Sequence, residues 1–152
     1  MKVEIVKALQ ENLGTHFRAC ALFGSFAKEN PSPQSDIDLL VVTKELEQDR
    51  IKRRVRIYRA LKEVKKKLGR DFSIVDLELE ELKDLTLLLV NIAEEGIILY
   101  DQEKELTRLF QKIKSAVEKA GLVRYNTKDG KYGWKPQVPL RRDQRIVLKL
   151  EG

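Results

Sequence analysis

The sequence predicts an α/β fold of the mixed α+β kind, in which helices flank a small central mixed sheet and a small basic appendage follows. Segments with apolar residues every three or four positions alternate along the chain with shorter segments in which apolar residues alternate or run together. Glycines at positions 14, 69, 96 and 121 directly follow the helical segments. Strands that alternate with helices in this way are typical of helices packed on a sheet.

The expected elements follow from these patterns. Ile5, Leu9 and Leu13 recur every four residues and predict a helix over residues 2–13. The other expected elements are strands over residues 17–23, 36–43, 72–79 and 97–100, and helices over residues 46–68, 80–95 and 102–120. We expect residues 1–100 to form the main domain and residues 101–152 to form a C-terminal helix and a basic tail with a β-hairpin.

Composition narrows the class of protein. The 152 residues fit one domain, perhaps with an appendage. The single cysteine, Cys20, lies within an apolar strand, so it is expected to pack in the core and has no partner for a disulfide. The N-terminus lacks the apolar stretch of a signal peptide, and no apolar run reaches the roughly 20 residues that a membrane span needs. These features predict a cytoplasmic protein.

One motif carries most of the chemical information. Gly24 and Ser25 end the first strand, ten residues follow, and Asp36 and Asp38 open the second strand. Residues two apart on a strand point to the same face, so the two carboxylates should converge. Mg²⁺ prefers such oxygen ligands and often shares them with substrate phosphates, and a turn of small residues can offer N–H groups to those phosphates. An Asp-x-Asp alone is expected by chance in a chain that is 36% charged, but the joint pattern is not.

The segment resembles the signature of the DNA polymerase β nucleotidyltransferase superfamily, and most of all the minimal nucleotidyltransferases of prokaryotes. The resemblance covers residues 1–100 and implies the polymerase-β-like nucleotidyltransferase fold. It also implies that Gly24 and Ser25 hold the triphosphate of ATP while Asp36 and Asp38 bind two Mg²⁺ ions. Many relatives have Ala-Arg-Gly after the serine turn, whereas this chain has Ala27-Lys28-Glu29. Lys28 can still place a positive charge near phosphate, as a point charge.

The resemblance further implies a third catalytic carboxylate on a neighbouring strand. Asp76 lies between Val75 and Leu77, where an unpaired charge is costly. We therefore expect Asp76 to be the general base and a shared metal ligand, with an ordinary edge-strand aspartate as the alternative. Asp71, at the start of the same strand, is explained by turn chemistry.

Two basic regions bear on partners. Residues 50–70 contain eleven Lys or Arg and one acidic residue, and residues 121–152 carry a net charge of +5. A solvated helix face is the ordinary explanation of the first region, and a docking surface for RNA or an acidic protein is the alternative. In the tail, Tyr125, Tyr132 and Trp134 lie among the charges, around a turn expected at 128–130. These aromatic residues can stack on bases or pack the hairpin onto the main domain.

The resemblance also implies a function. Many minimal members of the superfamily pair with a small all-helical HEPN protein, an RNase toxin, and act as antitoxins that adenylylate one of its tyrosines. We therefore expect a Mg²⁺-dependent nucleotidyltransferase that transfers AMP from ATP to a HEPN-type partner. Two alternatives remain open: transfer to a small molecule or an RNA end, and a non-catalytic binding module that neutralises its partner by occlusion.

Overall fold

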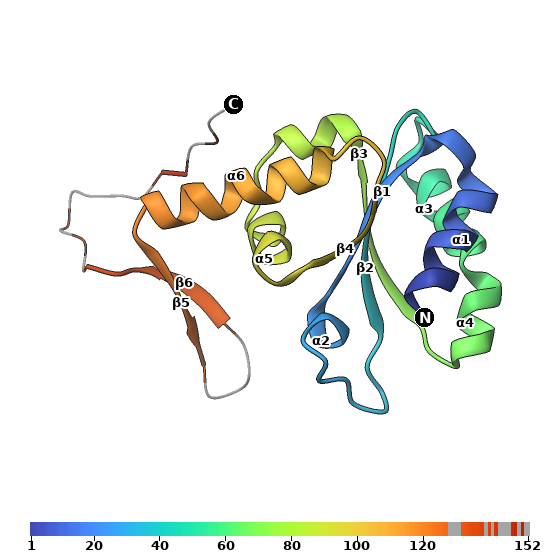
Figure 1. Cartoon of the computed structure of the whole chain (residues 1–152), viewed down its shortest axis with the longest axis horizontal. Coiled ribbons are helices and arrows are strands. Elements are labelled where there is room, and N and C mark those ends of the chain that lie inside the picture. The colour runs from blue at the N-terminus through green and yellow to red at the C-terminus, as the bar shows by residue number, and fades with distance from the viewer. Residues whose placement is uncertain (128–131, 139, 141, 143–146, 149, 151–152) are drawn as a thin grey trace.

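A four-stranded mixed sheet forms the centre of the computed structural model, which describes residues 1–127, 132–138, 140, 142, 147, 148 and 150. The strands are β1 (Phe17–Phe23), β2 (Ile37–Thr43), β3 (Phe72–Glu78) and β4 (Ile97–Asp101), in the spatial order β3-β2-β1-β4 (Figure 1). β1 pairs antiparallel with β2 and β4, and β2 pairs parallel with β3. The predicted mixed sheet with flanking helices is confirmed.

Helices cover both faces of this sheet. On one face lie α1 (Lys2–Leu13), α3 (Arg50–Ala60) and α4 (Lys62–Leu68), and on the other lie α5 (Leu87–Glu95) and α6 (Glu105–Lys119) (Figure 1). Alternate residues of β2 enter the two cores, because successive side chains of a strand point to opposite faces. Leu39 and Val41 pack with the α1/α3 core, and Leu40 and Val42 pack with the α5/α6 core.

Two of the expected long helices are divided. The helix expected over 46–68 begins only at Arg50, where the Asp49 carboxylate accepts the N–H groups of Ile51 and Lys52. It then breaks at the buried Leu61 into α3 and α4. The stretch expected as a helix over 80–95 is a 3₁₀ helix, η2 (Leu79–Lys83), followed by α5. Side-chain caps set the start of α3 at Asp49 and the start of α5 at Thr86, within a continuous apolar pattern, whereas no side-chain cap accompanies the break at Leu61.

Other connections in the core are short. The 3₁₀ helix η1 (Gly14–His16) links α1 to β1. Cys20 is buried in β1 as expected, and this burial raises the pKa of its thiol to about 12. The apolar side of α6 belongs to the same core as α5 and the sheet. The expected domain boundary at residue 100 stays a prediction.

The C-terminal segment forms the expected hairpin. β5 (Leu122–Asn126) pairs antiparallel with β6 (Tyr132–Pro136), and the turn expected at 128–130 lies outside the described residues. The half-buried Trp134 donates its indole N–H to Asn91 Oδ1 of α5 at 2.8 Å. Of the two roles considered for the tail's aromatic residues, packing onto the main domain is therefore the one that Trp134 takes.

None of the helices in the part of the chain that the structure describes is long and apolar enough to cross a membrane.

Candidate active site

The two halves of the motif meet at one end of the sheet. Gly24 and Ser25 follow β1 and open the short helix α2 (Gly24–Ala27), while Asp38 lies near the start of β2. Because β1 and β2 are antiparallel, the end of β1 lies beside the start of β2, and Phe23 pairs with Asp38. We call this the motif end of the sheet; α2 marks it in Figure 1.

Gly24 is required here for two independent reasons. Its φ of +68° lies in the left-handed region that side chains disfavour. In addition, a Cβ on Gly24 would lie only 2.1 Å from Oδ2 of Asp38. The glycine thus lets the backbone turn press directly against the Asp38 carboxylate.

Gly24→Ala should abolish transfer and lower the stability by about 1 kcal/mol or more, because it adds both backbone strain and a collision with Asp38. Gly69→Ala is the matched control: Gly69 has a similar φ of +65°, but a Cβ there would meet nothing within 4 Å. Thermal unfolding should show a loss in both variants, while a transfer assay should show a loss only for Gly24→Ala. Normal transfer by a folded Gly24→Ala would remove the turn from the site.

The two carboxylates of the motif repel each other. Asp38 is half-buried and Asp36 is exposed. Burial, followed by the charge of Asp36, raises the pKa of Asp38, and a hydrogen bond from Ser73 partly opposes the shift. Two close carboxylates, one of them partly buried, repel each other. A divalent cation bound between them would offset this repulsion, and carboxylate oxygens are ligands that such cations prefer. Asp36 and Asp38 therefore fit Mg²⁺.

Asp76 does not join this site, which corrects our expectation. It pairs in register with Val41 and lies on the α1/α3 face, whereas Asp38 shares the opposite face with Leu40. Only 2% of the Asp76 side chain is exposed, and its oxygens accept from Arg53 Nε at 2.8 Å and Arg54 Nε at 2.9 Å. Asp76 is thus a buried structural anion that joins α3 to β3. Its charge is balanced by arginines that are distant in sequence.

Ser73, and not the expected Asp76, is the residue of β3 that lies beside Asp38. It is the register partner of Asp38 on the parallel strand β3, and its hydroxyl hydrogen-bonds to Asp38. Within the described residues, no three His, Cys, Asp or Glu side chains converge into a metal site. The motif end therefore offers two protein carboxylates to a metal, and further ligands would come from phosphate oxygens.

Sequence reasoning missed two residues that shape the motif end. Arg70 donates to the carbonyls of Ser32 at 2.8 Å and Ser35 at 2.9 Å, and its guanidinium lies 4.8 Å from the ring centre of Phe26. It thereby fastens the loop that leads into Asp36. In the sequence Arg70 was only one of the many cations of residues 50–70.

Glu95 is the second missed residue. It ends α5, its side chain is only 10% exposed, and its Oε2 lies 3.0 Å from Nζ of Lys28. The charge of Glu95 also contributes to the raised pKa of Asp38, after burial and Asp36. Lys28, expected to face phosphate, is thus held at the motif end by a carboxylate that no local sequence pattern connects with the motif.

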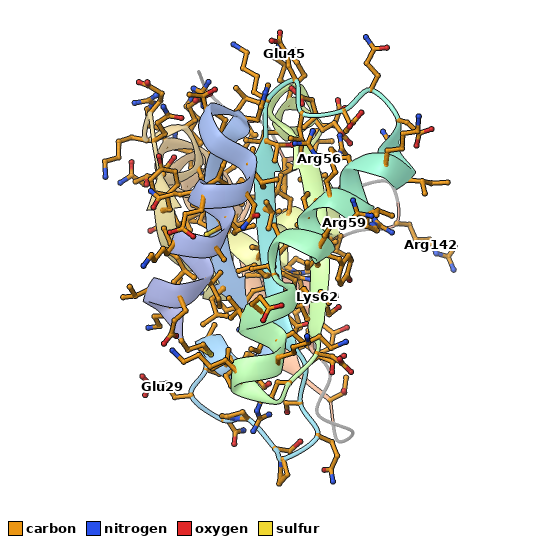
Figure 2. All side chains as sticks on the ribbon, turned by 90° about the vertical axis from the view of Figure 1, so that its right-hand side faces the viewer. Glu29, Glu45, Arg56, Arg59, Lys62 and Arg142 are labelled. Atoms are coloured by element: carbon orange, nitrogen blue, oxygen red, sulfur yellow. The ribbon has the colours of Figure 1, made fainter. Side chains whose placement is uncertain are left out.

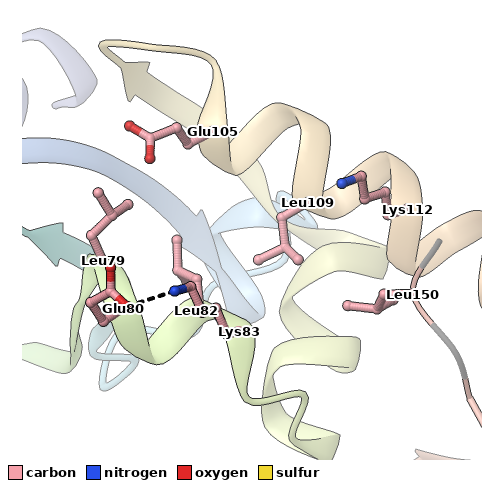
Figure 3. Close-up of a pocket in the computed structure, with 8 residues that line it drawn as sticks. All are labelled: Leu79, Glu80, Leu82, Lys83, Glu105, Leu109, Lys112 and Leu150. Carbon is pink, nitrogen blue, oxygen red and sulfur yellow. Dashed lines mark hydrogen bonds and ion pairs between the residues drawn. The ribbon is translucent and has the colours of Figure 1, made fainter. Parts of the chain in front are cut away.

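A separate cavity of about 420 Å³ lies between η2 and α6 (Figure 3). Apolar side chains of Leu79, Leu82 and Leu109 line it, and the exposed pair Glu80–Lys83, 2.7 Å apart, lies at its edge. It contains none of the motif residues.

Comparison with known families identifies the family of the domain. The family model described as polymerase beta, nucleotidyltransferase matches residues 4–105, well over half of the chain, and includes the whole motif. The chain belongs to this family. It therefore contains a nucleotidyltransferase domain, and the matched range includes Gly24, Ser25, Asp36 and Asp38.

Solved structures show the same fold. A chain from a toxin–antitoxin complex with AMP-PNP is 22% identical, with a TM-score of 0.56 over 78% of this chain and 87% of that chain. A chain from the MntA–HepT toxin–antitoxin complex is 21% identical, with a TM-score of 0.50 over 78% and 85%. A chain from the complex of a tri-AMPylated Shewanella oneidensis HEPN toxin with its MNT antitoxin is 21% identical, with a TM-score of 0.50 over 78% and 84%. No curated protein matches the chain.

Proposed function

We propose that this nucleotidyltransferase transfers AMP from ATP to a tyrosine of a small HEPN-type partner and thereby acts as an antitoxin. The observation that carries the catalytic part is the contact between Gly24 and Asp38 beside Asp36, in a chain of the nucleotidyltransferase family. A tight turn that opens a short helix beside two carboxylates suits a triphosphate that arrives with its cation.

The reaction would be an in-line attack on the α-phosphorus, with pyrophosphate as the leaving group. Asp36 and Asp38 would hold Mg²⁺, which supplies charge neutralisation and orientation for the phosphates. The turn at Gly24 and Ser25 would bind the triphosphate, and Asn30 closes this turn by donating its N–H to the Ser25 carbonyl at 2.9 Å. With two carboxylates in place of three, the site fits one ion directly. A second ion would share the same two carboxylates.

The solved structures support a HEPN-type protein as the partner. Chains that share this fold come from complexes of an MNT antitoxin with a HEPN toxin, one with AMP-PNP and one with a toxin modified by AMP. This chain spans 84–87% of the length of those chains. The likeness of fold makes a HEPN-type protein the first acceptor to test.

Intact-mass analysis tests the proposal. A HEPN-type protein that co-purifies with this chain should gain the mass of one or more AMP groups after incubation with Mg²⁺ and ATP, and none with the Asp38→Asn variant. Parallel reactions with the other three nucleoside triphosphates test the nucleotide preference. An unchanged partner mass with all four nucleotides would contradict the proposed acceptor.

A groove on α3 and α4 favours one second candidate, transfer to an RNA end. The groove measures about 660 Å³ and is lined by Arg54, Val55, Tyr58, Arg59, Lys62 and Lys65. Arg59 and Lys62 have no ion-pair partner in the described part of the chain, and Figure 2 shows both along the outer side of these helices. Lys65, at one end of this groove, forms an ion pair with Asp71 at 2.7 Å. Asp71 directly precedes β3, close to the motif end.

Two experiments distinguish the candidate functions: the effect of salt on bound RNA, and the effect of a catalytic variant on protection from the partner. RNA that co-purifies and is released as salt rises, and that is lost from a double variant Arg59→Glu, Lys62→Glu, would favour the RNA acceptor. The third possibility, occlusion without chemistry, predicts that Asp38→Asn still protects cells from the partner toxin. Loss of protection with retained binding would exclude it.

A further inference from the structure

The outer side of α3 carries a row of exposed apolar residues. Ile51, Val55 and Tyr58 follow one another at spacings of four and three, so they form one stripe along the helix. Their exposed fractions are 76%, 46% and 41%, whereas Ile57 and Ala60 on the inner side of α3 are buried. We call Ile51, Val55 and Tyr58 the α3 stripe. An exposed apolar stripe on a helix that already packs on its core is typical of an interaction surface.

The groove beside the α3 stripe is strongly basic. This groove, of about 660 Å³, is lined by two members of the stripe and by four cations: Val55, Tyr58, Arg54, Arg59, Lys62 and Lys65. None of the described residues that line it is acidic. Figure 2 shows Arg59 and Lys62 along the outer side of α3 and α4. The surface therefore fits a ligand that combines apolar and acidic groups.

Tyr58 indicates the shape of that ligand. Its hydroxyl accepts the N–H of Ile74 on β3 at 3.2 Å, although the tyrosine is 41% exposed. Because β3 is an edge strand of the sheet, this hydroxyl takes an N–H group that an added strand would use. The contact therefore favours a helix that lies along α3 over an extended peptide that pairs with β3. The anchored tyrosine also loses little conformational entropy when a ligand covers its ring.

The apolar stripe distinguishes two ligands that the cations alone would both suit. RNA binds mainly through its phosphates, and aliphatic side chains such as Ile51 and Val55 add little to that contact. A partner helix with apolar residues at helical spacing would bury the stripe, and acidic residues beside them would pair with Arg59 and Lys62. The stripe and its flanking charges together therefore favour an acidic amphipathic helix.

We propose that the α3 stripe and the groove beside it dock an acidic amphipathic helix of the partner protein. The inference rests on the proposed function and deepens it, because it gives the HEPN-type acceptor, expected to be all-helical, a surface on which it is held. Lys65 lies at one end of the groove and pairs with Asp71 close to the motif end. A partner docked along α3 and α4 is thus held beside the candidate active site.

A synthetic peptide tests the chemistry of this surface. The probe is a helical peptide with leucine at every third or fourth position and glutamate on both sides of the leucines, and calorimetry without Mg²⁺ or ATP measures its affinity. The double variant Ile51→Ser, Val55→Ser should bind the peptide at least about tenfold more weakly, the loss typical of anchor residues in an interface. Both side chains are exposed, so the fold should be kept. Single-stranded oligouridine should bind this variant as it binds the wild type.

The charges are tested with the same probe. Arg59→Glu combined with Lys62→Glu should also weaken peptide binding about tenfold or more, because attraction becomes repulsion. Lys112→Glu combined with Lys114→Glu, at exposed positions of α6, changes the net charge equally and is the control. A wild type that does not bind the peptide, or variants that all bind it equally, would overturn the proposal. Oligouridine that binds where the peptide does not would assign the surface to RNA.

Photo-crosslinking then tests the position of the partner itself. Val55→Cys, labelled with a benzophenone maleimide, should crosslink to an acidic helix of the HEPN-type protein that co-purifies. Cys20 is buried and its thiol pKa is raised to about 12, so the label reacts at the new cysteine. Val3→Cys is the matched control, since Val3 is 78% exposed on α1 and lines a different groove, beside β4. A crosslink from Val3→Cys and not from Val55→Cys would contradict the docking surface.

The two proposals can fail separately. The crosslink needs no nucleotide transfer, so it should also form with the Asp38→Asn variant. A crosslink in an acidic helix of a partner that gains no AMP would leave the docking surface standing and contradict the proposed function. A partner that gains AMP but is not crosslinked through Val55→Cys would confirm the transfer and overturn the docking surface.

Discussion

Asp36→Asn and Asp38→Asn should each abolish nucleotidyl transfer and leave the fold intact. Each change removes one of the two carboxylates that the motif end offers to a cation, and Ser73, the neighbour of Asp38 on β3, cannot replace it. The measurement is single-turnover transfer with saturating ATP and Mg²⁺. Near-normal transfer by either variant would show that these aspartates are not the metal site.

The stability of the same variants provides a second measurement. The folded state raises the pKa of Asp38, so its ionisation opposes folding and the wild type loses stability as the pH rises through this pKa. Asp38→Asn has no such ionisation. Without Mg²⁺, the variant should therefore match the wild type in acid and become the more stable protein toward neutral pH. Addition of Mg²⁺ should stabilise only the wild type. A variant that is much less stable at every pH would point to a structural role.

Asp76→Asn should lower the free energy of unfolding by about 3 kcal/mol, although Asp76 is not in the site. Removal of one partner from a buried ion pair typically costs about 3–5 kcal/mol, because the other charge stays buried without compensation. Here that charge is Arg53, whose side chain is 6% exposed. The low end applies because Glu81 remains 3.2 Å from Arg53. Urea denaturation measures the effect.

Asp71→Asn is the matched control for Asp76→Asn. Asp71 is 64% exposed and pairs with Lys65 on the surface, so its loss should change the stability by no more than about 0.5 kcal/mol. The Asp76→Asn variant itself should still transfer nucleotide at temperatures where it is folded. A stable Asp76→Asn that has lost all transfer would return Asp76 to the catalytic machinery.

Local patterns in the sequence predicted most of the fold. The helix over 2–13 and the strand over 17–23 have the expected bounds, and the mixed sheet is confirmed. The breaks at Leu61 and before Thr86 escaped prediction because apolar periodicity continues through them. Capping by Glu78 and Thr86 sets the bounds of η2 and α5, because it competes with helix continuation at short range, and capping by Asp49 sets the start of α3; no side-chain cap accompanies the break at Leu61.

The candidate site was harder to predict wherever it depends on contacts between distant segments. Gly24 and Asp38 are close in sequence, and their spacing alone indicated their proximity. The face on which Asp76 lies depends on the register of β3 against β2, which no local pattern specifies. Glu95 and Arg70 reach the motif end only through the packing of α5 and the position of α4's end, so their roles required the structure.

The serine beside Asp38, Ser73, bears on how acidic the attacking hydroxyl of the acceptor must be. A serine hydroxyl carries no negative charge at neutral pH, so Ser73 cannot withdraw a proton from an attacking hydroxyl as a carboxylate would. The acceptor must then give up its proton with less assistance from the protein, and a more acidic hydroxyl reacts more readily. A phenol ionises near pH 10, whereas an unactivated water molecule is a much weaker acid. The proposed tyrosine acceptor, as a phenol, would need less of this assistance than a less acidic hydroxyl would.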